Sequence, residues 1–174
     1  GWLHRRYKVD VWHCTYGYPL GVSLIHYARK FRDVPHIVRC VGDDIQVEHH
    51  IKYGMRLNKN IDKQVRQWLP RADSLVAISE SVAEEYRQLG VSEACIEQIP
   101  NGVDLERFSH TVVDREGVRA HYGIPSDAFV FISVGRNHPK KNIEGLIRAF
   151  SNVKSDGQPI VLLIIGPGIK DLQW

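Results

Sequence analysis

The sequence lacks a long hydrophobic run. Its longest unbroken apolar stretch extends from Ile160 to Ile165, far short of the ~18 residues that a membrane-spanning helix needs. No positively charged start followed by an apolar segment marks a signal peptide at Gly1. These absences argue against an integral membrane protein, and we expect a soluble one.

Cysteine is also scarce, and neither sign of charge dominates. Cys14, Cys40 and Cys95 lie far apart with no CxxC spacing. This pattern excludes a zinc ribbon and a disulfide framework, and it predicts reduced thiols on buried strands in a cytoplasmic protein. Lys and Arg number 23 against 20 Asp and Glu, a net charge of +3. The near balance excludes a strongly basic nucleic-acid-binding arm, and the 43% hydrophobic content excludes a disordered chain.

Short apolar runs alternate with helical stretches along the chain, a pattern typical of βα units on a parallel sheet. The predicted strands are Val9 to Cys14, His36 to Val41, Ser74 to Ile78, Cys95 to Ile99, Ala128 to Val134 and Pro159 to Ile165. We therefore predict an α/β protein with Rossmann-like parallel sheets and helices on both faces. Because the chain begins at Gly1 rather than Met and stops soon after the last run, we expect a fold that is incomplete at both ends.

Apolar periodicity predicts four helices between these runs. They are Gly21 to Arg32, Ser81 to Leu89, Arg115 to Tyr122, and a helix that Asn142 opens. Ser81 with Glu84 resembles a capping box. Asn142 is a predicted N-cap, and the apolar residues of its helix, the last of which is Val153, all face one side.

A break in the pattern predicts a domain boundary. The stretch PNGVDLERF at 100–108 combines a proline, an Asn-Gly turn and mixed charges. We predict the later part of a first Rossmann-like domain at 1–100, an interdomain connection at 101–127 and the start of a second domain at 128–174. The second part holds only two predicted strands, fewer than such domains usually have.

The loop between Val134 and Asn142 is the strongest candidate site. It follows a predicted strand and precedes a predicted helix, so it lies where open α/β sheets bind ligands. Gly135 lets the backbone approach a ligand, the helix amides favour an anion, and Arg136 and Lys141 add positive charge. This combination suits a diphosphate, and the alternative is a solvated basic turn.

The same loop resembles the nucleotide-sugar diphosphate loop of retaining family-four glycosyltransferases of the GT-B fold. Four other segments agree with that family in the right order. They are DVWH at 10–13, RADSLVAISESV at 71–82, IPNGVDLERF at 99–108 and LIIGPG at 163–168. The resemblance covers nearly the whole chain, in the family's N-terminal acceptor-side domain and C-terminal nucleotide-sugar-binding domain.

The resemblance implies transfer of a sugar from a nucleotide-sugar donor, such as a UDP- or GDP-sugar, to an acceptor hydroxyl with retention, in glycan or glycolipid biosynthesis. Arg136 and Lys141 would be the catalytic pair that stabilises the departing diphosphate. The implied donor-binding residues are Gly135, Arg136, Lys141, Asn142, Gly166 and Gly168. No metal or other cofactor is expected, and the 174-residue chain alone is expected to be inactive.

The first domain departs from the family pattern at one place. Val41 stands where family members usually have a histidine before glycine. Asp43 and Asp44 follow it, and either could bind a hydroxyl of donor or acceptor, or Asp44 could simply cap the next segment. His13 could reach the acceptor from the end of the first strand, or be a core residue. The aromatic segment 16–21 could shape an acceptor pocket or form a turn.

Basic residues concentrate between positions 52 and 71. They are Lys52, Arg56, Lys59, Lys63, Arg66 and Arg71, against one acid, Asp62. The cluster could hold the protein at an anionic membrane surface, at ~1 kcal/mol per basic residue, which would place it at the inner face of the membrane. A solvated helix face is the competing interpretation. Nucleic-acid binding is not expected, because no interleaved aromatics or known reading motif accompany the charges.

Two other functions remain open. One is a non-catalytic nucleotide- or phosphate-binding Rossmann-like module that keeps the phosphate loop without the chemistry. The other is a flavodoxin-like regulatory domain, which predicts one compact five-stranded sheet with an acidic pocket instead of a division near Pro100.

Overall fold

The computed structural model describes residues 6–28, 30, 34–109 and 114–169. The chain forms two compact units, unit 1 at Gly1–Gly102 and unit 2 at Val103–Trp174. The division follows the Asn-Gly turn, inside the segment 101–127 for which an interdomain connection is predicted. Among the described residues, no helix combines the length and apolar character needed to cross a membrane.

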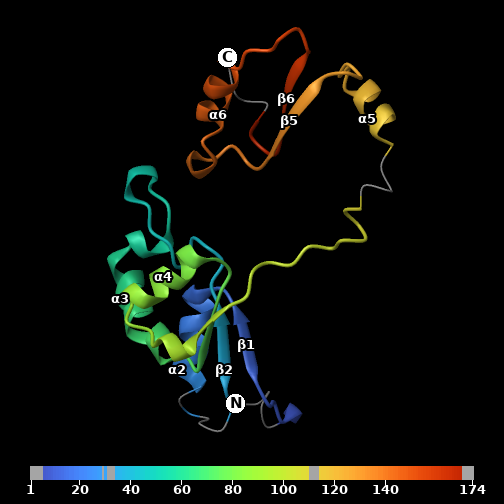
Figure 1. Ribbon diagram of the computed structural model, residues 1–174. Helices are drawn as coiled ribbons and strands as arrows, with labels where there is room; N and C mark the ends of the chain where they lie inside the picture. The colour runs from blue at the N-terminus through green and yellow to red at the C-terminus, as the bar shows by residue number, and fades with distance from the viewer. Residues whose placement is uncertain (1–5, 29, 31–33, 110–113, 170–174) are drawn as a thin grey trace. The chain divides into compact units, whose positions relative to one another are not determined.

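Unit 1 is built on a four-stranded parallel sheet (Figure 1). Its strands are β1 (Trp12–Thr15), β2 (His36–Arg39), β3 (Ser74–Ala77) and β4 (Ile96–Gln98), and they lie side by side in chain order. All four fall on predicted apolar runs. The first begins later than predicted because its ladder with β2 starts at the pair Trp12 and His36.

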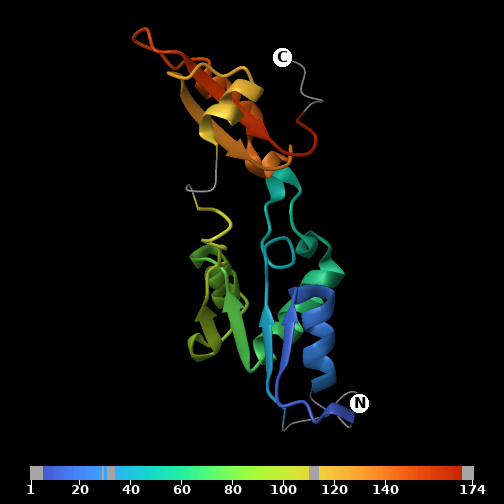
Figure 2. The same ribbon diagram turned by 90° about the vertical axis from the view of Figure 1, so that its right-hand side faces the viewer.

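Three helices join these strands: α2 (Val22–Ala28), α3 (Lys59–Trp68) and α4 (Glu80–Gln88). All three lie on one face of the sheet (Figures 1 and 2). Each crossover steps to the next strand in the same direction, and right-handed crossovers of that kind place their helices on the same side. Within the described part of unit 1 this differs from the predicted coverage of both faces, because the strand order never reverses.

The core of unit 1 fills the space between this sheet and its helices. Its largest fully buried side chains include Tyr86, Ile25, Leu75 and Val65. The Tyr86 hydroxyl donates to the Val76 carbonyl at 3.0 Å and accepts from the Cys40 amide at 3.1 Å, so its polar end is satisfied. Full burial of each large aliphatic side chain is worth about 1.5–3 kcal/mol.

Two helices of unit 1 bear on the sequence predictions. Helix α3 lies in the basic segment for which a solvated helix face was one interpretation, and Ile61, Val65 and Trp68 line its inner side. The predicted capping box is wrong: the N-cap of α4 is Ser79, and Ser81 already lies inside the helix. The Ser79 and Ser81 hydroxyls lie 3.0 Å apart and hydrogen-bond each other.

The cysteines are free, as predicted. Cys40 is buried directly after β2, while Cys14 on β1 and Cys95 before β4 are half-buried. Burial, followed by the nearby Asp44 carboxylate, raises the pKa of the Cys40 thiol well above its ordinary value. Such a thiol stays protonated and unreactive at neutral pH.

Unit 2 contains a two-stranded parallel sheet of β5 (Phe129–Val134) and β6 (Ile160–Ile165), paired along their whole length. Helix α5 (Arg115–His121) precedes the sheet, and α6 (Ile143–Phe150) connects its strands (Figure 1). All four elements match predicted segments closely, because each has a clear apolar pattern or a glycine at its end.

The sheet of unit 2 is covered on one side by α6. Phe131 contacts Phe150 with ring centroids 5.7 Å apart. The alternate residues Ile132 and Val134 are 62% and 71% exposed. Val153, predicted to share the apolar face of α6, lies beyond the end of the helix and is exposed.

Candidate functional site

Two loops meet at the carboxyl end of the unit 2 sheet. The loop after β5 begins at Gly135, whose amide donates to the Ile165 carbonyl at 2.8 Å. Two residues later, the Asn137 amide donates to the Pro167 carbonyl at 2.9 Å. The pairing of β5 and β6 therefore continues into both loops, and it brings the predicted donor segments 135–142 and 166–168 together.

Glycine is required where these loops touch. Gly166 has φ +157°, and a Cβ there would lie 1.9 Å from the Gly135 carbonyl oxygen. Gly168 has φ +75°, and its Cβ would lie 3.3 Å from the Asn137 Cβ. A side chain at Gly166 would separate the loops, since the atom it meets belongs to the backbone. The glycines predicted at the donor site thus have a steric reason to be glycine.

The two predicted cations, Arg136 and Lys141, belong to the loop that begins at Gly135. The stem of Lys141 lies along Gly135, where an added Cβ would be 3.5 Å from Lys141 Cε. Arg136 and Lys141 are both exposed. Among the described residues, neither side chain forms an ion pair or hydrogen bond within the protein. Their charges are therefore available to a ligand.

The middle of the loop is a single 3₁₀ turn at Pro139–Lys141. His138 caps it, and its Nδ1 accepts a hydrogen bond from the Lys140 amide at 3.2 Å. The turn closes with the Lys141 amide donating to the His138 carbonyl at 2.7 Å. These local bonds hold the backbone that carries Lys141.

Asn142 occupies the N-cap position of α6, but the predicted side-chain cap is wrong. The residue adopts a left-handed conformation with φ 47° and ψ 46°, and its side chain forms no capping hydrogen bond. Instead, the side chain lies over Gly145, where an added Cβ would meet Asn142 Nδ2 at 2.4 Å. Because the cap is absent, the first-turn amides of α6 keep their capacity to bind an anion.

In unit 1, Asp44 connects the loops that follow β1 and β2. This residue is fully buried, and its carboxylate accepts hydrogen bonds from the amides of Gly17 at 2.5 Å, Val41 at 3.0 Å and Gly42 at 2.8 Å. Asp44 was a candidate contact for acceptor or sugar, and burial removes it from that role. It fastens the loop after β1 to the loop after β2.

Asp43 is different, because it is only half-buried. It accepts a hydrogen bond from the Tyr16 hydroxyl at 2.5 Å. That hydrogen bond, followed by partial burial, raises the pKa of Tyr16 to about 12. Tyr16 itself has φ 97°, an unusual backbone conformation for a residue with a side chain. The Tyr16–Asp43 pair is therefore a partly accessible polar pair at these strand ends.

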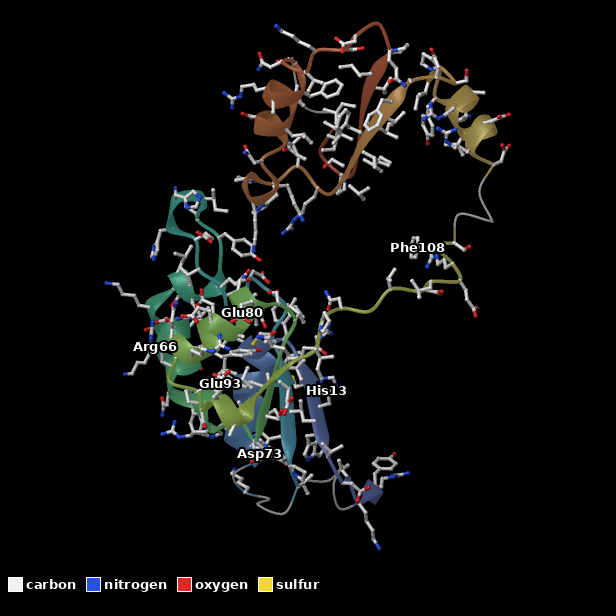
Figure 3. The ribbon with its side chains drawn as sticks, viewed as in Figure 1. His13, Arg66, Asp73, Glu80, Glu93 and Phe108 are labelled. Carbon is white, nitrogen blue, oxygen red and sulfur yellow. The ribbon has the colours of Figure 1, made fainter. Side chains whose placement is uncertain are left out.

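His13 is not at the end of β1, contrary to expectation. The strand continues to Thr15, and His13 is its second residue. The side chain is exposed, which also excludes the alternative of a core histidine. In Figure 3 it lies on the strand side of unit 1, away from the helix layer.

Val41 occupies the position for which the family resemblance implies a histidine. Its amide is engaged by Asp44, and an aliphatic side chain supplies no hydrogen bond to a sugar.

Arg39, at the end of β2, donates a hydrogen bond to the side chain of Asn101 at the Asn-Gly turn. Sequence reasoning missed this contact, since the two residues are 62 positions apart.

The described residues contain no group of three or more His, Cys, Asp and Glu side chains arranged to hold a metal.

Parallel strands joined by helices define an α/β protein with Rossmann-like sheets. Comparison with known families agrees with this class. A model described as Glycosyltransferase Family 4 matches residues 2–107, and one described as Glycosyl transferases group 1 matches residues 114–173. The chain belongs to the family-four glycosyltransferases, which confirms the resemblance of its motifs.

Curated relatives support this assignment. An alpha-monoglucosyldiacylglycerol synthase of Streptococcus pneumoniae is 26% identical over 95% of this chain and 38% of its own length. A D-inositol 3-phosphate glycosyltransferase of Geodermatophilus obscurus is 32% identical over 90% of this chain and 29% of its own length. The chain thus spans only about a third of the length of these relatives.

A solved structure shows the same fold. The crystal structure of Anabaena HepE in complex with UDP superposes with a TM-score of 0.56 at 21% identity, over 87% of this chain and 38% of HepE. The likeness confirms the α/β class with parallel sheets and a GT-B-like fold.

Proposed function

We propose that this chain is part of a glycosyltransferase that moves a sugar from a nucleotide-sugar donor to an acceptor hydroxyl. The observation that carries the proposal is the pair of interlocked loops in unit 2, with Arg136 and Lys141 exposed and free of partners among the described residues. HepE, which has a similar fold, was crystallised with UDP, and this supports a nucleotide-sugar as the donor.

In this proposal the donor diphosphate binds over Gly135, where the backbone lets it approach closely. The Arg136 guanidinium and the Lys141 ammonium donate to its oxygens, and the first amides of α6 add further donors. Each charge-assisted hydrogen bond contributes about 1.5–3 kcal/mol. These bonds strengthen as negative charge builds on the leaving diphosphate, so they lower the barrier to cleavage of its bond to the sugar.

Unit 1 would supply the acceptor contact through Asp43. Its carboxylate can accept a hydrogen bond from an acceptor hydroxyl, and Tyr16 holds it in place at 2.5 Å. Retention of the anomeric configuration is proposed from family membership. Because the chain spans about a third of its relatives' length, we expect turnover only from a protein that also holds the remaining parts.

Nucleotide binding by the 174-residue chain tests the donor site. We expect UDP or GDP to bind more tightly than the corresponding nucleoside, and Arg136→Ala to weaken diphosphate binding roughly 10- to 100-fold. Lys154→Ala is the matched control, since it removes an exposed cation elsewhere in unit 2. Isothermal titration calorimetry measures both. Undiminished UDP and GDP affinity in Arg136→Ala would contradict the proposed donor site.

Val41 favours a second candidate, a binding module that has lost the chemistry, because no imidazole is present at that position. Donor hydrolysis by the protein that contains this chain distinguishes the two. If the protein releases the sugar and Arg136→Ala abolishes that release, the result supports the enzyme. Binding of the nucleotide sugar without any release supports the binding module.

A further inference from the structure

Helix α3 carries a column of cations on unit 1. Lys59, Lys63 and Arg66 are spaced four and three residues apart, so their side chains lie above one another along the helix. All three are exposed, and Figure 3 shows Arg66 on the helix side of unit 1, away from His13. Like charges at this spacing repel and destabilise a helix. Arg66 offsets this through its ion pair with Asp62 of the same helix, whereas Lys59 and Lys63 have no such pair among the described residues.

The column borders a pocket of about 610 Å³ between α3, α4 and the segment that follows β2. Six of its lining side chains carry a fixed charge: Arg56, Lys59, Asp62, Lys63, Arg66 and Glu85. Four of them are cations and two are acids, which leaves a net charge of +2. The pocket lies wholly within unit 1 and shares no residue with the donor loops of unit 2.

The inner part of this pocket is connected by hydrogen bonds and is nearly neutral. The Arg56 side chain is only 5% exposed and donates to Asp62 Oδ1 and to Glu85 Oε2, each at 2.8 Å. It also donates to the Ile45 carbonyl at 2.7 Å. Arg66 Nε donates to the second oxygen of Asp62 at 2.7 Å. Both acids are therefore already engaged by arginine.

The acidic side chain on α3 stays ionised in this setting. Burial by itself would raise the pKa of Asp62, but hydrogen bonds from Arg66 and Arg56 outweigh that effect and lower the pKa below its ordinary value. Lys59 and Lys63, by contrast, form no ion pair or side-chain hydrogen bond with any other described residue. The uncompensated positive charge of the pocket thus lies on these two lysines.

We propose that this pocket binds a phosphate group, held by the ammonium groups of Lys59 and Lys63 with Arg66 beside them. Lysine ammoniums are compact charges with three donors each, which suits phosphate oxygens. The engaged acids contribute little repulsion, because arginine neutralises them. The phosphate can belong to a lipid headgroup at an anionic membrane or to a soluble phosphorylated ligand. This site does not depend on the donor site.

Titration of the 174-residue chain with inorganic phosphate, followed by amide chemical shifts, tests the pocket. We expect millimolar binding with shifts centred on residues 58–66, and about tenfold weaker binding in the double variant Lys59→Gln/Lys63→Gln. Lys30→Gln/Lys154→Gln is the matched control, because it removes the same charge from exposed lysines outside the pocket. Both lysines of the test variant are exposed, so it should fold normally.

Vesicle sedimentation identifies the source of the phosphate. If the chain sediments with phosphatidylglycerol vesicles but not with phosphatidylcholine vesicles, and only the test variant loses this, the pocket takes a lipid headgroup. If inorganic phosphate binds at the pocket and no vesicle does, it takes a soluble phosphorylated ligand. The proposal is overturned if phosphate fails to bind, or if the test and control variants bind it equally.

Discussion

The strand ends of unit 1 and unit 2 use their polar groups in opposite ways. In unit 1, Asp44 accepts from three backbone amides and Tyr16 donates to Asp43, so polar groups satisfy one another. In unit 2, Arg136 and Lys141 have no partner among the described residues, and the loops are shaped by glycine contacts. Internal hydrogen bonds therefore stabilise the unit 1 loops, whereas unit 2 leaves its two cations exposed.

The largest expected effect is the loss of the carboxylate that organises unit 1. Asp44→Ala leaves three amide donors without their partner, at about 1–3 kcal/mol each. We expect the free energy of unfolding of unit 1 to fall by about 4 kcal/mol, with hydrogen exchange of the β2 and β3 amides accelerated accordingly.

Asp43→Ala is the matched control for Asp44→Ala. It removes a neighbouring carboxylate that accepts a hydrogen bond from Tyr16, and it should cost only about 1 kcal/mol. Equal destabilisation by the two variants would contradict the assignment of Asp44 as the residue that organises the unit 1 loops.

The next effect concerns the steric contact in unit 2. Gly166→Ala places a Cβ 1.9 Å from the Gly135 carbonyl oxygen at φ +157°. We expect a loss of about 3 kcal/mol in the stability of unit 2, and loss of nucleotide diphosphate binding because the loops separate. Thermal unfolding measures the loss of stability, and isothermal titration calorimetry measures the loss of nucleotide diphosphate binding.

Gly157→Ala separates the clash from backbone strain. Gly157 also has a positive φ of +94°, but a Cβ there meets nothing within 4 Å. It should cost about 1 kcal/mol and leave nucleotide affinity unchanged. If Gly166→Ala binds nucleotide as well as Gly157→Ala does, contact between the loops is irrelevant to the site.

The smallest effect is the loss of a hydrogen bond near the surface of unit 1. Tyr16→Phe should cost about 1 kcal/mol. Because the hydrogen bond to Asp43 raises the pKa of Tyr16 from 10.0 to about 12, the folded state favours the protonated phenol. Its contribution is complete below pH 10 and is lost as pH rises through about 12. Urea unfolding of both proteins across this range should show their difference shrinking, and a constant difference would contradict the assignment.

The strands were the most predictable feature. Runs such as 160–165 are continuously apolar, as expected for strands of a parallel sheet covered by helices, and the pattern identifies them without knowledge of their partners. The glycines at 135, 166 and 168 were also predictable as a set, because the resemblance to a family places them in order along the chain.

Helix α3 and the helix caps were harder to predict. Ile61, Val65 and Trp68 have the i, i+4, i+7 spacing of an amphipathic helix, but the many basic residues around them also fit a membrane-binding cluster, so the sequence leaves two interpretations open. At α4, Ser79 and Ser81 are both acceptable caps by residue type. The choice between them depends on where the chain leaves β3, which local sequence does not specify.

By itself, the sequence determined the α/β class, the positions of the strands and the glycine-rich loop with its two cations, because each depends on short-range patterns or on motif order. Only the tertiary structure decided that Asp44 is internal and that Arg56 joins Glu85, 29 residues away. Burial and pairing of this kind arise when distant segments pack together, and the free energy of a charge depends on which partners that packing provides.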